Sequence, residues 1–258
     1  MSSTLQERLS TLRSDPQFSG LRRSLEIYYG DPARDEAMDR LYDRFIGAGD
    51  LAFDIGSHVG DRIGAFRRLG ARVVAVEPQP DCAEVIRRLY GDDPAVTLIE
   101  AACGREPGRI SLHVNSANPT VTTASADFIY AAMGAGGWEG QVWDREIETE
   151  VATLDELVRR FGQPRFAKID VEGFEADVLA GLSLPLTALS FEFTTIQRDI
   201  AVTCVDRLIA IGDYRFNAAL GESQTLSLDD WVGGSEIKDF IRTLPHEANS
   251  GDVYALLV

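Results

Sequence analysis

The chain of 258 residues is 45% hydrophobic and 26% charged, an ordinary composition for a globular protein with one large domain. Its formal net charge of −16 argues against nucleic acid or an anionic membrane surface as a partner, because both attract clustered lysine and arginine. The three scattered cysteines, with no apolar leader and no apolar run of about 18 residues, predict a reduced, cytoplasmic protein.

Residues 1–47 are predicted to form a helical cover that precedes a larger domain at 48–258. Apolar residues recur at helical spacing near its end, at Met38, Leu41, Tyr42, Phe45 and Ile46. Gly47 and Gly49 then end the helical pattern. The sequence leaves open whether this cover contacts a second copy of the chain, as in a homodimer, or closes over a site.

The next segment combines a buried strand at 51–55, a glycine turn, a helix at 62–69 and a second strand at 72–76. Gly56 and Gly60 let the backbone approach a ligand closely, and the helix start after them offers free N–H groups. Glu77 follows Gly56 by 21 residues, close to the interval at which an acid binds ribose hydroxyls in nucleotide-binding folds. The pattern therefore predicts a site for a cofactor that contains a nucleoside.

The turn departs from the dinucleotide fingerprint G-x-G-x-x-G, since Ser57 and His58 stand where glycine would be expected. Bulkier residues leave less room for a diphosphate, and the Asp54 carboxylate at the end of the first strand suits a cationic ligand. S-adenosylmethionine carries an ammonium, a sulfonium and a ribose. We therefore predict S-adenosylmethionine rather than NAD; the alternative is a βαβ unit whose glycines serve only the turn.

Strands and helices continue to alternate, which predicts an α/β fold with a mostly parallel sheet and helices on both faces. Strands are expected at 96–102, 108–114, 146–153, 166–171, 188–193, 214–220 and 253–258, and helices at 81–90, 153–161, 174–182 and 199–211. Asp81 and Thr153 are the expected N-caps of two helices, and Thr153 forms a capping box with Glu156.

Residues 115–145 follow a strand that we expect to be a hairpin-like addition, and they are too long for an ordinary connection. They are rich in polar and small residues and are predicted to form a substrate loop or lid. Trp138 and Trp143 either stack on a substrate or pack within the loop itself.

Acidic residues end or closely follow five of the predicted strands, at Asp54, Glu77, Glu100, Asp170 with Glu172, and Glu192. Ligands of such sheets bind beyond the carboxyl ends of the strands, so these acids predict an acidic rim around the site. The rim suits a cationic cofactor, a polyhydroxylated substrate, or both. Asp170, Glu172 and Glu192 would also suit Mg²⁺ or Ca²⁺, but their spacing is not diagnostic and we assign no metal ligand.

Four segments together resemble the FkbM-type S-adenosylmethionine-dependent methyltransferases: 53–60 (FDIGSHVG), 76–78 (VEP), 168–181 (KIDVEGFEADVLAG) and 251–255 (GDVYA). The third segment is far more specific than the glycine turn. The resemblance runs from about residue 27 to the C-terminus. It implies a Rossmann-like methyltransferase fold, with a seven-stranded sheet whose last strand is antiparallel, and O-methylation, often of a hydroxyl on a sugar or natural product.

By position, the resemblance assigns Gly56 and Gly60 to the methionine part of the cofactor and Glu77 to its ribose. Ala101 and Ala102 are assigned to the adenine, and Asp170 to the transferring methyl group and the methionine amine. The complete predicted cofactor site consists of Asp54, Gly56, Ser57, His58, Gly60, Glu77, Pro78, Ala101, Ala102 and Asp170.

Methyl transfer to a hydroxyl requires an aligned nucleophile and a group that accepts its proton. The candidate catalytic residues are Asp170, Glu172, Lys168 and His58. Lys168 is expected to orient the acids by pairing, while His58 either contacts substrate or serves the start of the helix. The segment after Glu192 lacks a histidine often found there in the family, so the general base stays unassigned.

The sequence thus predicts a cytoplasmic S-adenosylmethionine-dependent O-methyltransferase. Its expected partner is a small hydroxylated substrate, with a sugar or glycan precursor as the acceptor, and not nucleic acid or a membrane. One alternative is an NAD-linked oxidoreductase, which would need a proton-relay pair such as Tyr-x-x-x-Lys that we do not find near the site. The other is a non-catalytic cofactor-binding scaffold, against which the intact Asp54, Gly56, Glu77 and Asp170 argue.

Overall fold

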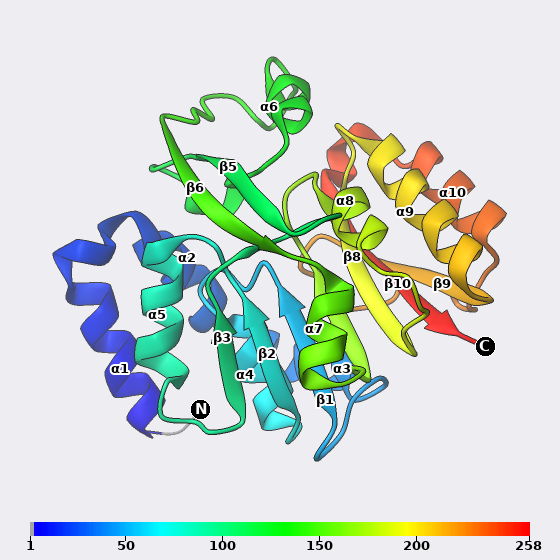
Figure 1. Ribbon diagram of the computed structural model, residues 1–258. Coiled ribbons are helices and arrows are strands. Elements are labelled where there is room, and N and C mark those ends of the chain that lie inside the picture. The colour runs from blue at the N-terminus through cyan, green and yellow to red at the C-terminus, as the bar shows by residue number, and fades with distance from the viewer. Residues whose placement is uncertain (1–2) are drawn as a thin grey trace.

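A seven-stranded sheet forms the centre of the computed structural model, which describes residues 3–258 (Figure 1). Its strands are β1 (Leu51–Ile55), β2 (Arg72–Val76), β3 (Val96–Ile99), β7 (Phe166–Ile169), β8 (Ala188–Thr194), β9 (Tyr214–Leu220) and β10 (Ser250–Leu257). Their order is β3-β2-β1-β7-β8-β10-β9, and β10 runs antiparallel to the other six strands of this sheet. The predicted α/β class with an antiparallel last strand is confirmed.

The central strand β1 lies between β2 and β7, and all five of its residues are buried. A parallel strand covered on both faces needs a nearly continuous apolar run, which is why its sequence does not alternate. The chain continues to opposite sides of β1 through β2 and β7. In open α/β sheets, ligands bind at such a switch point, beyond the carboxyl ends of the strands.

The N-terminal helices cover one face of the sheet. They are α1 (Ser3–Ser14), the 3₁₀ helix η1 (Pro16–Leu21), α2 (Arg22–Tyr29), α3 (Pro32–Tyr42), α4 (Asp61–Arg68) and α5 (Pro80–Tyr90). The predicted apolar stripe from Met38 to Ile46 is buried here, and Phe45 stacks on Phe166 and Tyr254 of the sheet. The segment predicted as a helical cover is therefore continuous with the main core; its residues 1 and 2 lie outside the described part of the chain.

The opposite face is covered by α7 (Leu154–Phe161), α8 (Glu175–Ala180), α9 (Arg198–Ile211) and α10 (Gly234–Thr243). The capping box of α7 is confirmed: the Thr153 hydroxyl accepts the Glu156 N–H at 3.1 Å, and the Glu156 carboxylate accepts the Thr153 N–H at 3.0 Å. Helix α10 was not predicted, although Ile237 and Ile241 are fully buried one turn apart.

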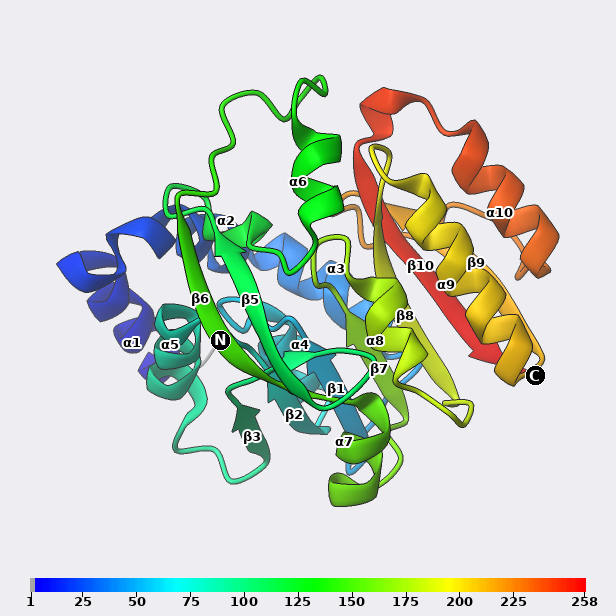
Figure 2. The ribbon, with the colours of Figure 1, turned by 45° about the horizontal axis from the view of Figure 1, so that its top comes forward.

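A second, three-stranded sheet lies above the carboxyl ends of the central strands (Figure 2). It consists of β4 (Ala102–Cys103), β6 (Arg145–Ala152) and β5 (Gly108–Val114), and β5 and β6 form the predicted hairpin-like addition. The segment that joins β5 to β6 contains the 3₁₀ helix η2 (Pro119–Val121) and an unpredicted helix, α6 (Ala126–Ala132). Trp138 and Trp143 pack edge-on against Phe128 of α6, so both rings belong to this segment's own small core.

Three boundary predictions that involve residues at the site were wrong. The strand predicted at 166–171 ends at Ile169, so Asp170 follows it directly. The strand predicted at 96–102 ends at Ile99, and Ala102 joins the second sheet instead. Helix α5 begins at Pro80, so Gln79 is the N-cap rather than Asp81, which lies in the first turn. Proline favours the first helical position because its missing N–H needs no partner there. Pro80 therefore begins the helix, and the N-cap lies two residues before the predicted one.

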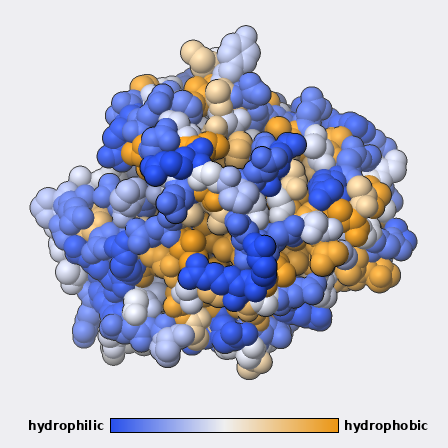
Figure 3. Space-filling model, viewed as in Figure 1, coloured by the Kyte–Doolittle hydropathy of each residue, from blue (hydrophilic) through white to orange (hydrophobic). Residues whose placement is uncertain are grey.

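The face seen in Figure 3 is mostly hydrophilic, with apolar residues gathered near its middle, below the second sheet. No helix within residues 3–258 is both long enough and apolar enough to cross a membrane.

Candidate active site

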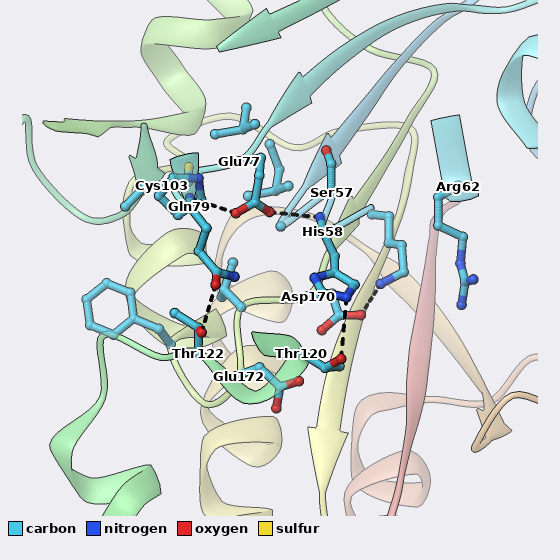
Figure 4. Close-up of a pocket in the computed structure, with 18 of the residues that line it drawn as sticks. Ser57, His58, Arg62, Glu77, Gln79, Cys103, Thr120, Thr122, Asp170 and Glu172 are labelled. Atoms are coloured by element: carbon cyan, nitrogen blue, oxygen red, sulfur yellow. Dashed lines mark hydrogen bonds and ion pairs between the residues drawn. The ribbon is translucent and has the colours of Figure 1, made fainter. Parts of the chain in front are cut away.

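A cavity lies at the carboxyl ends of β1, β2 and β7, roofed by the second sheet and the segment after β5 (Figure 4). Ten of the predicted site residues line it: Gly56, Ser57, His58, Glu77, Pro78, Ala101, Ala102, Lys168, Asp170 and Glu172. Residues far apart in the sequence therefore meet at one place, which is the switch point of the sheet.

Gly56 brings the turn after β1 against the turn after β7. Its φ is +81°, and a Cβ built on it would lie 1.8 Å from the Asp170 carbonyl oxygen. Only glycine avoids both the left-handed strain and the clash at this position. The close approach seen here is between the two backbone turns beside the cavity. The predicted approach of Gly56 to a ligand stays a prediction.

Gly60 and Asp54 do not line the cavity. Gly60 is the left-handed N-cap of α4, and a Cβ on it would meet Tyr90, Ile63 and Ile86 in the core. The Asp54 side chain is 1% exposed, and neither of its carboxylate oxygens accepts a hydrogen bond from the described residues. Burial raises the pKa of Asp54 to about 6, although the Lys168 ammonium opposes the shift. The Asp54 carboxylate therefore lies buried beneath the cavity rather than in its wall.

Glu77 closes the β2 side of the cavity and is 2% exposed. Its two carboxylate oxygens accept the backbone N–H groups of His58 and Gln79, each at 2.8 Å (Figure 4). Burial raises its pKa to about 8 despite these hydrogen bonds. One acid thus joins the glycine turn to the start of α5, and near neutral pH it is poised between its charged and neutral forms.

His58 lines the cavity, and its backbone has a left-handed φ of +47°. Its Nδ1 lies 3.5 Å from the Cys82 Sγ and its Nε2 lies 3.4 Å from the Thr120 Oγ1. Burial lowers the pKa of His58 to about 4, against the opposing charges of Asp61 and Asp170. The imidazole is therefore neutral at physiological pH.

Lys168 and Asp170 form the ion pair that the sequence predicted, with Nζ 2.5 Å from Oδ2. They lie two residues apart at the end of β7, so both side chains emerge on the same face of the sheet. Burial raises the pKa of Asp170, but the Lys168 ammonium more than offsets it, and the net shift is downward. Asp170 thus carries its charge at the cavity.

Glu172 projects from a tight turn between β7 and α8. Its φ of +55° is rare for a non-glycine residue, and such strain often accompanies function. The turn is held because the Thr123 hydroxyl donates to the Glu172 carbonyl at 2.6 Å, and Glu175 accepts the N–H groups of Val171 and Gly173. The Glu172 carboxylate itself accepts no hydrogen bond from the described residues, so it is free for a ligand.

Glu192 of β8 approaches these two acids, and one carboxylate oxygen from each of Asp170, Glu172 and Glu192 lies within 4.8 Å of the others. Burial and the neighbouring charges raise the pKa values of Glu172 and Glu192 well above the usual range. Glu100, the other predicted member of the acidic rim, instead points outward and pairs with Arg87 at 2.7 Å.

Several lining residues were missed by the sequence analysis. Arg62 donates to Asp61 and Glu222, and Arg34 donates to the same two acids, which forms a network at the α4 side of the cavity. Burial acts to raise the pKa of Asp61, but the guanidinium groups of Arg62 and Arg34 outweigh it and lower that pKa to about 2. Tyr28 lies next to this network. Because these residues come from 28 to 222, only the fold brings them together.

Residues 120–123, here called the threonine strap, cross the cavity opposite the glycine turn. The Thr122 hydroxyl donates to the Gln79 Oε1 at 2.9 Å, and the Gln79 Nε2 donates to the Pro119 carbonyl at 3.2 Å. Thr120 in turn lies beside His58. The strap therefore contacts His58 and Gln79, the two residues whose N–H groups donate to Glu77. The signal for Gln79 was its place two residues after Glu77, whereas nothing in the sequence placed the threonines here.

A family model described as "Methyltransferase FkbM domain" matches residues 54–231, which is more than half of the chain. The chain belongs to the FkbM methyltransferase family. As a member of that family it is a methyltransferase with S-adenosylmethionine as cofactor, and the oxidoreductase interpretation is set aside. No curated protein matches the sequence.

Several solved structures are similar to this FkbM-family chain at low identity. An O-methyltransferase from Bacillus cereus in complex with S-adenosylhomocysteine is 14% identical, with 100% of this chain and 92% of that chain covered and a TM-score of 0.48. A precorrin-6y C5,15-methyltransferase from Geobacter metallireducens is 12% identical, with 87% of each chain covered and a TM-score of 0.45. A TehB-like methyltransferase from Corynebacterium glutamicum is 10% identical, with 88% and 100% covered and a TM-score of 0.43.

The residues at the cavity fit the cofactor of the FkbM family. Glu77 is a buried acceptor beside the glycine turn, Ala101 and Ala102 offer a small apolar surface, and the uncompensated Glu172 carboxylate suits a cationic group. A sulfonium cofactor needs such a combination of an acid for its ribose, an apolar slot for its base and negative charge near its cationic end.

Proposed function

We propose that the protein is a cytoplasmic O-methyltransferase that transfers a methyl group to a hydroxyl of a small molecule, with a sugar or glycan precursor as the acceptor. The observation that carries the proposal is the cluster of Asp170, Glu172 and Glu192 beside the predicted cofactor site. A carboxylate-rich cavity provides many hydrogen-bond acceptors, which a polyhydroxylated acceptor can satisfy. It repels anionic acceptors.

When bound, S-adenosylmethionine supplies an electrophilic methyl group. Glu77 would hold its ribose, Ala101 and Ala102 would flank its adenine, and Asp170 would face its cationic end. Glu172 or Glu192, in its ionised form, would accept a hydrogen bond from the acceptor hydroxyl and take its proton, since a carboxylate with a raised pKa is a stronger base. Lys168 would keep Asp170 charged and oriented.

Calorimetry with S-adenosylhomocysteine, with NAD as the comparison, tests the first part of this proposal. We expect micromolar binding of S-adenosylhomocysteine alone. A panel of sugars and other hydroxylated small molecules, incubated with methyl-labelled S-adenosylmethionine, then tests the acceptor class. Label transferred to an amine, a thiol or a nucleic acid but to no hydroxyl would contradict O-methylation without affecting the cofactor assignment.

Binding of S-adenosylhomocysteine, the product left after methyl transfer, should release a proton near neutral pH. Glu77 has a pKa of about 8 in the free protein, so most of it is protonated at pH 7. Ribose hydroxyls that donate to its carboxylate favour the charged form and lower this pKa. The affinity for S-adenosylhomocysteine should therefore rise by roughly tenfold or more between pH 6 and pH 7.5.

Calorimetry in buffers of different ionisation enthalpy measures the proton release directly. Glu77→Gln removes the titrating group at similar volume, and we expect the proton release to disappear with it. Equal release from the variant and the natural protein would assign the proton to another group and refute this role of Glu77.

A further inference from the structure

When ionised, the three-acid cluster at the cavity carries more negative charge than the nearby cations of the protein neutralise. Its carboxylate oxygens lie within 4.8 Å of one another, on three different segments of the chain. Among the described residues, Lys168 forms its ion pair with Asp170 and with no other acid. When all three acids are ionised, three negative charges face this one ammonium, which leaves an excess of two. The nearby cations Arg34 and Arg62 are already paired with Asp61 and Glu222.

The geometry points to a divalent cation. Ligands on opposite sides of Ca²⁺ lie about 5 Å apart and those of Mg²⁺ about 4 Å apart, given their usual bond lengths to oxygen. The oxygens of the cluster lie no more than 4.8 Å apart, which does not exceed the span across Ca²⁺, so small side-chain movements would bring one oxygen of each acid to an ion between them. Asp170 directly follows β7 and Glu192 lies in β8, and these two strands pair in the main sheet. Glu172 lies in the turn before α8.

Two buried carboxylates without donors provide independent support. Glu172 is 8% exposed, lines the cavity and accepts no side-chain hydrogen bond from the described residues (Figure 4). Asp252, which is not part of the cluster, is also 8% exposed, and its Oδ1 is buried without a partner in the described residues. Asp252 is paired in register with Glu192 across β10 and β8, so the two side chains leave the same face side by side.

We propose that Asp170, Glu172 and Glu192 bind a hard divalent cation, Mg²⁺ or Ca²⁺, and that hydroxyl oxygens of the acceptor complete its coordination. The cation neutralises the two excess charges, and hard cations prefer the carboxylate and hydroxyl oxygens that meet here. The part of this inference that concerns the acceptor rests on the proposed function, whereas the cation site itself does not.

Manganese binding by the full-length protein tests the site without any need for activity. Chelator-treated protein is titrated with Mn²⁺, the free ion is followed by electron paramagnetic resonance, and Mg²⁺ and Ca²⁺ are added as competitors. We expect one strong site per chain, which Mg²⁺ or Ca²⁺ displaces. Glu192→Gln and Glu172→Gln should each weaken it at least tenfold, while Glu150→Gln, which changes an exposed acid on β6, should leave it unchanged.

Each variant is also titrated with S-adenosylhomocysteine, because retained affinity shows that it is folded. No saturable Mn²⁺ site, or equal affinity in the Glu192 and Glu150 variants, would overturn the inference. So would expulsion of Mn²⁺ by S-adenosylhomocysteine, since the acids would then serve the cofactor's cationic end. If S-adenosylhomocysteine binds and Mn²⁺ does not, the cation site alone fails; if neither the natural protein nor any variant binds S-adenosylhomocysteine, the cofactor site fails.

Discussion

Glu77→Ala is expected to weaken S-adenosylhomocysteine binding by about 100-fold, which corresponds to about 2.7 kcal/mol. Two effects combine. The ribose loses its acceptor, and hydrogen bonds to a charged group contribute about 1.5–3 kcal/mol. The N–H groups of His58 and Gln79 also lose their shared acceptor, so the glycine turn and the start of α5 are no longer joined.

Glu100→Ala is the matched control for this experiment. Glu100 also directly follows a strand of the main sheet, the edge strand β3, but its side chain is 53% exposed and pairs with Arg87 at the surface. Exposed ion pairs contribute little, so we expect less than a twofold change in affinity. Isothermal titration at one pH and salt concentration measures both variants. If Glu77→Ala binds as tightly as Glu100→Ala, the ribose is held elsewhere and the site assignment fails.

The order of strands and helices was predictable because burial leaves a direct mark on the sequence. The apolar run of β1 and the periodic face of α3 each show the spacing of their own element, and Thr153 with Glu156 marks a helix start that the structure reproduces. Helix α6 could not be predicted from the sequence because its segment is dominated by polar and small residues, and because it packs on Trp138 of the same segment.

Site residues that directly follow a strand could be predicted from the sequence, whereas those brought to the cavity by tertiary contacts could not. Gly56, Glu77 and Asp170 each follow a strand directly, so the carboxyl ends of the strands bring them together. Tyr28 and Glu222 reach the same cavity from opposite ends of the chain, and no spacing rule connects them. Gln79 illustrates the limit: its side chain is committed to the threonine strap, so it leaves α5 without a side-chain cap.

The two glycines of the turn after β1 have different roles in this chain. Gly60 serves the start of α4 and the packing of Tyr90, whereas Gly56 sets the distance between two turns at the cavity. The first role concerns the core alone. The second concerns stability and the site together, because the Asp170 carbonyl lies where a side chain would be.

Gly56→Ala should therefore lower the free energy of unfolding by more than about 3 kcal/mol, a loss typical of severe overpacking. The added Cβ would lie 1.8 Å from the Asp170 carbonyl oxygen, and this backbone atom cannot move without displacing the end of β7. The left-handed φ of +81° adds a strain of about 1 kcal/mol. Because the displaced turn carries Asp170, any folded protein should also bind S-adenosylhomocysteine less tightly.

Gly49→Ala separates the clash from the strain. Gly49 has a φ of +86°, nearly the same as Gly56, but a Cβ there meets nothing within 4 Å. We expect a loss of only about 1 kcal/mol and unchanged S-adenosylhomocysteine affinity, since strain is the sole effect. Equilibrium unfolding in urea compares the two variants through their midpoints. Equal losses would mean that the left-handed conformation, and not the contact between the two turns, is what requires glycine at position 56.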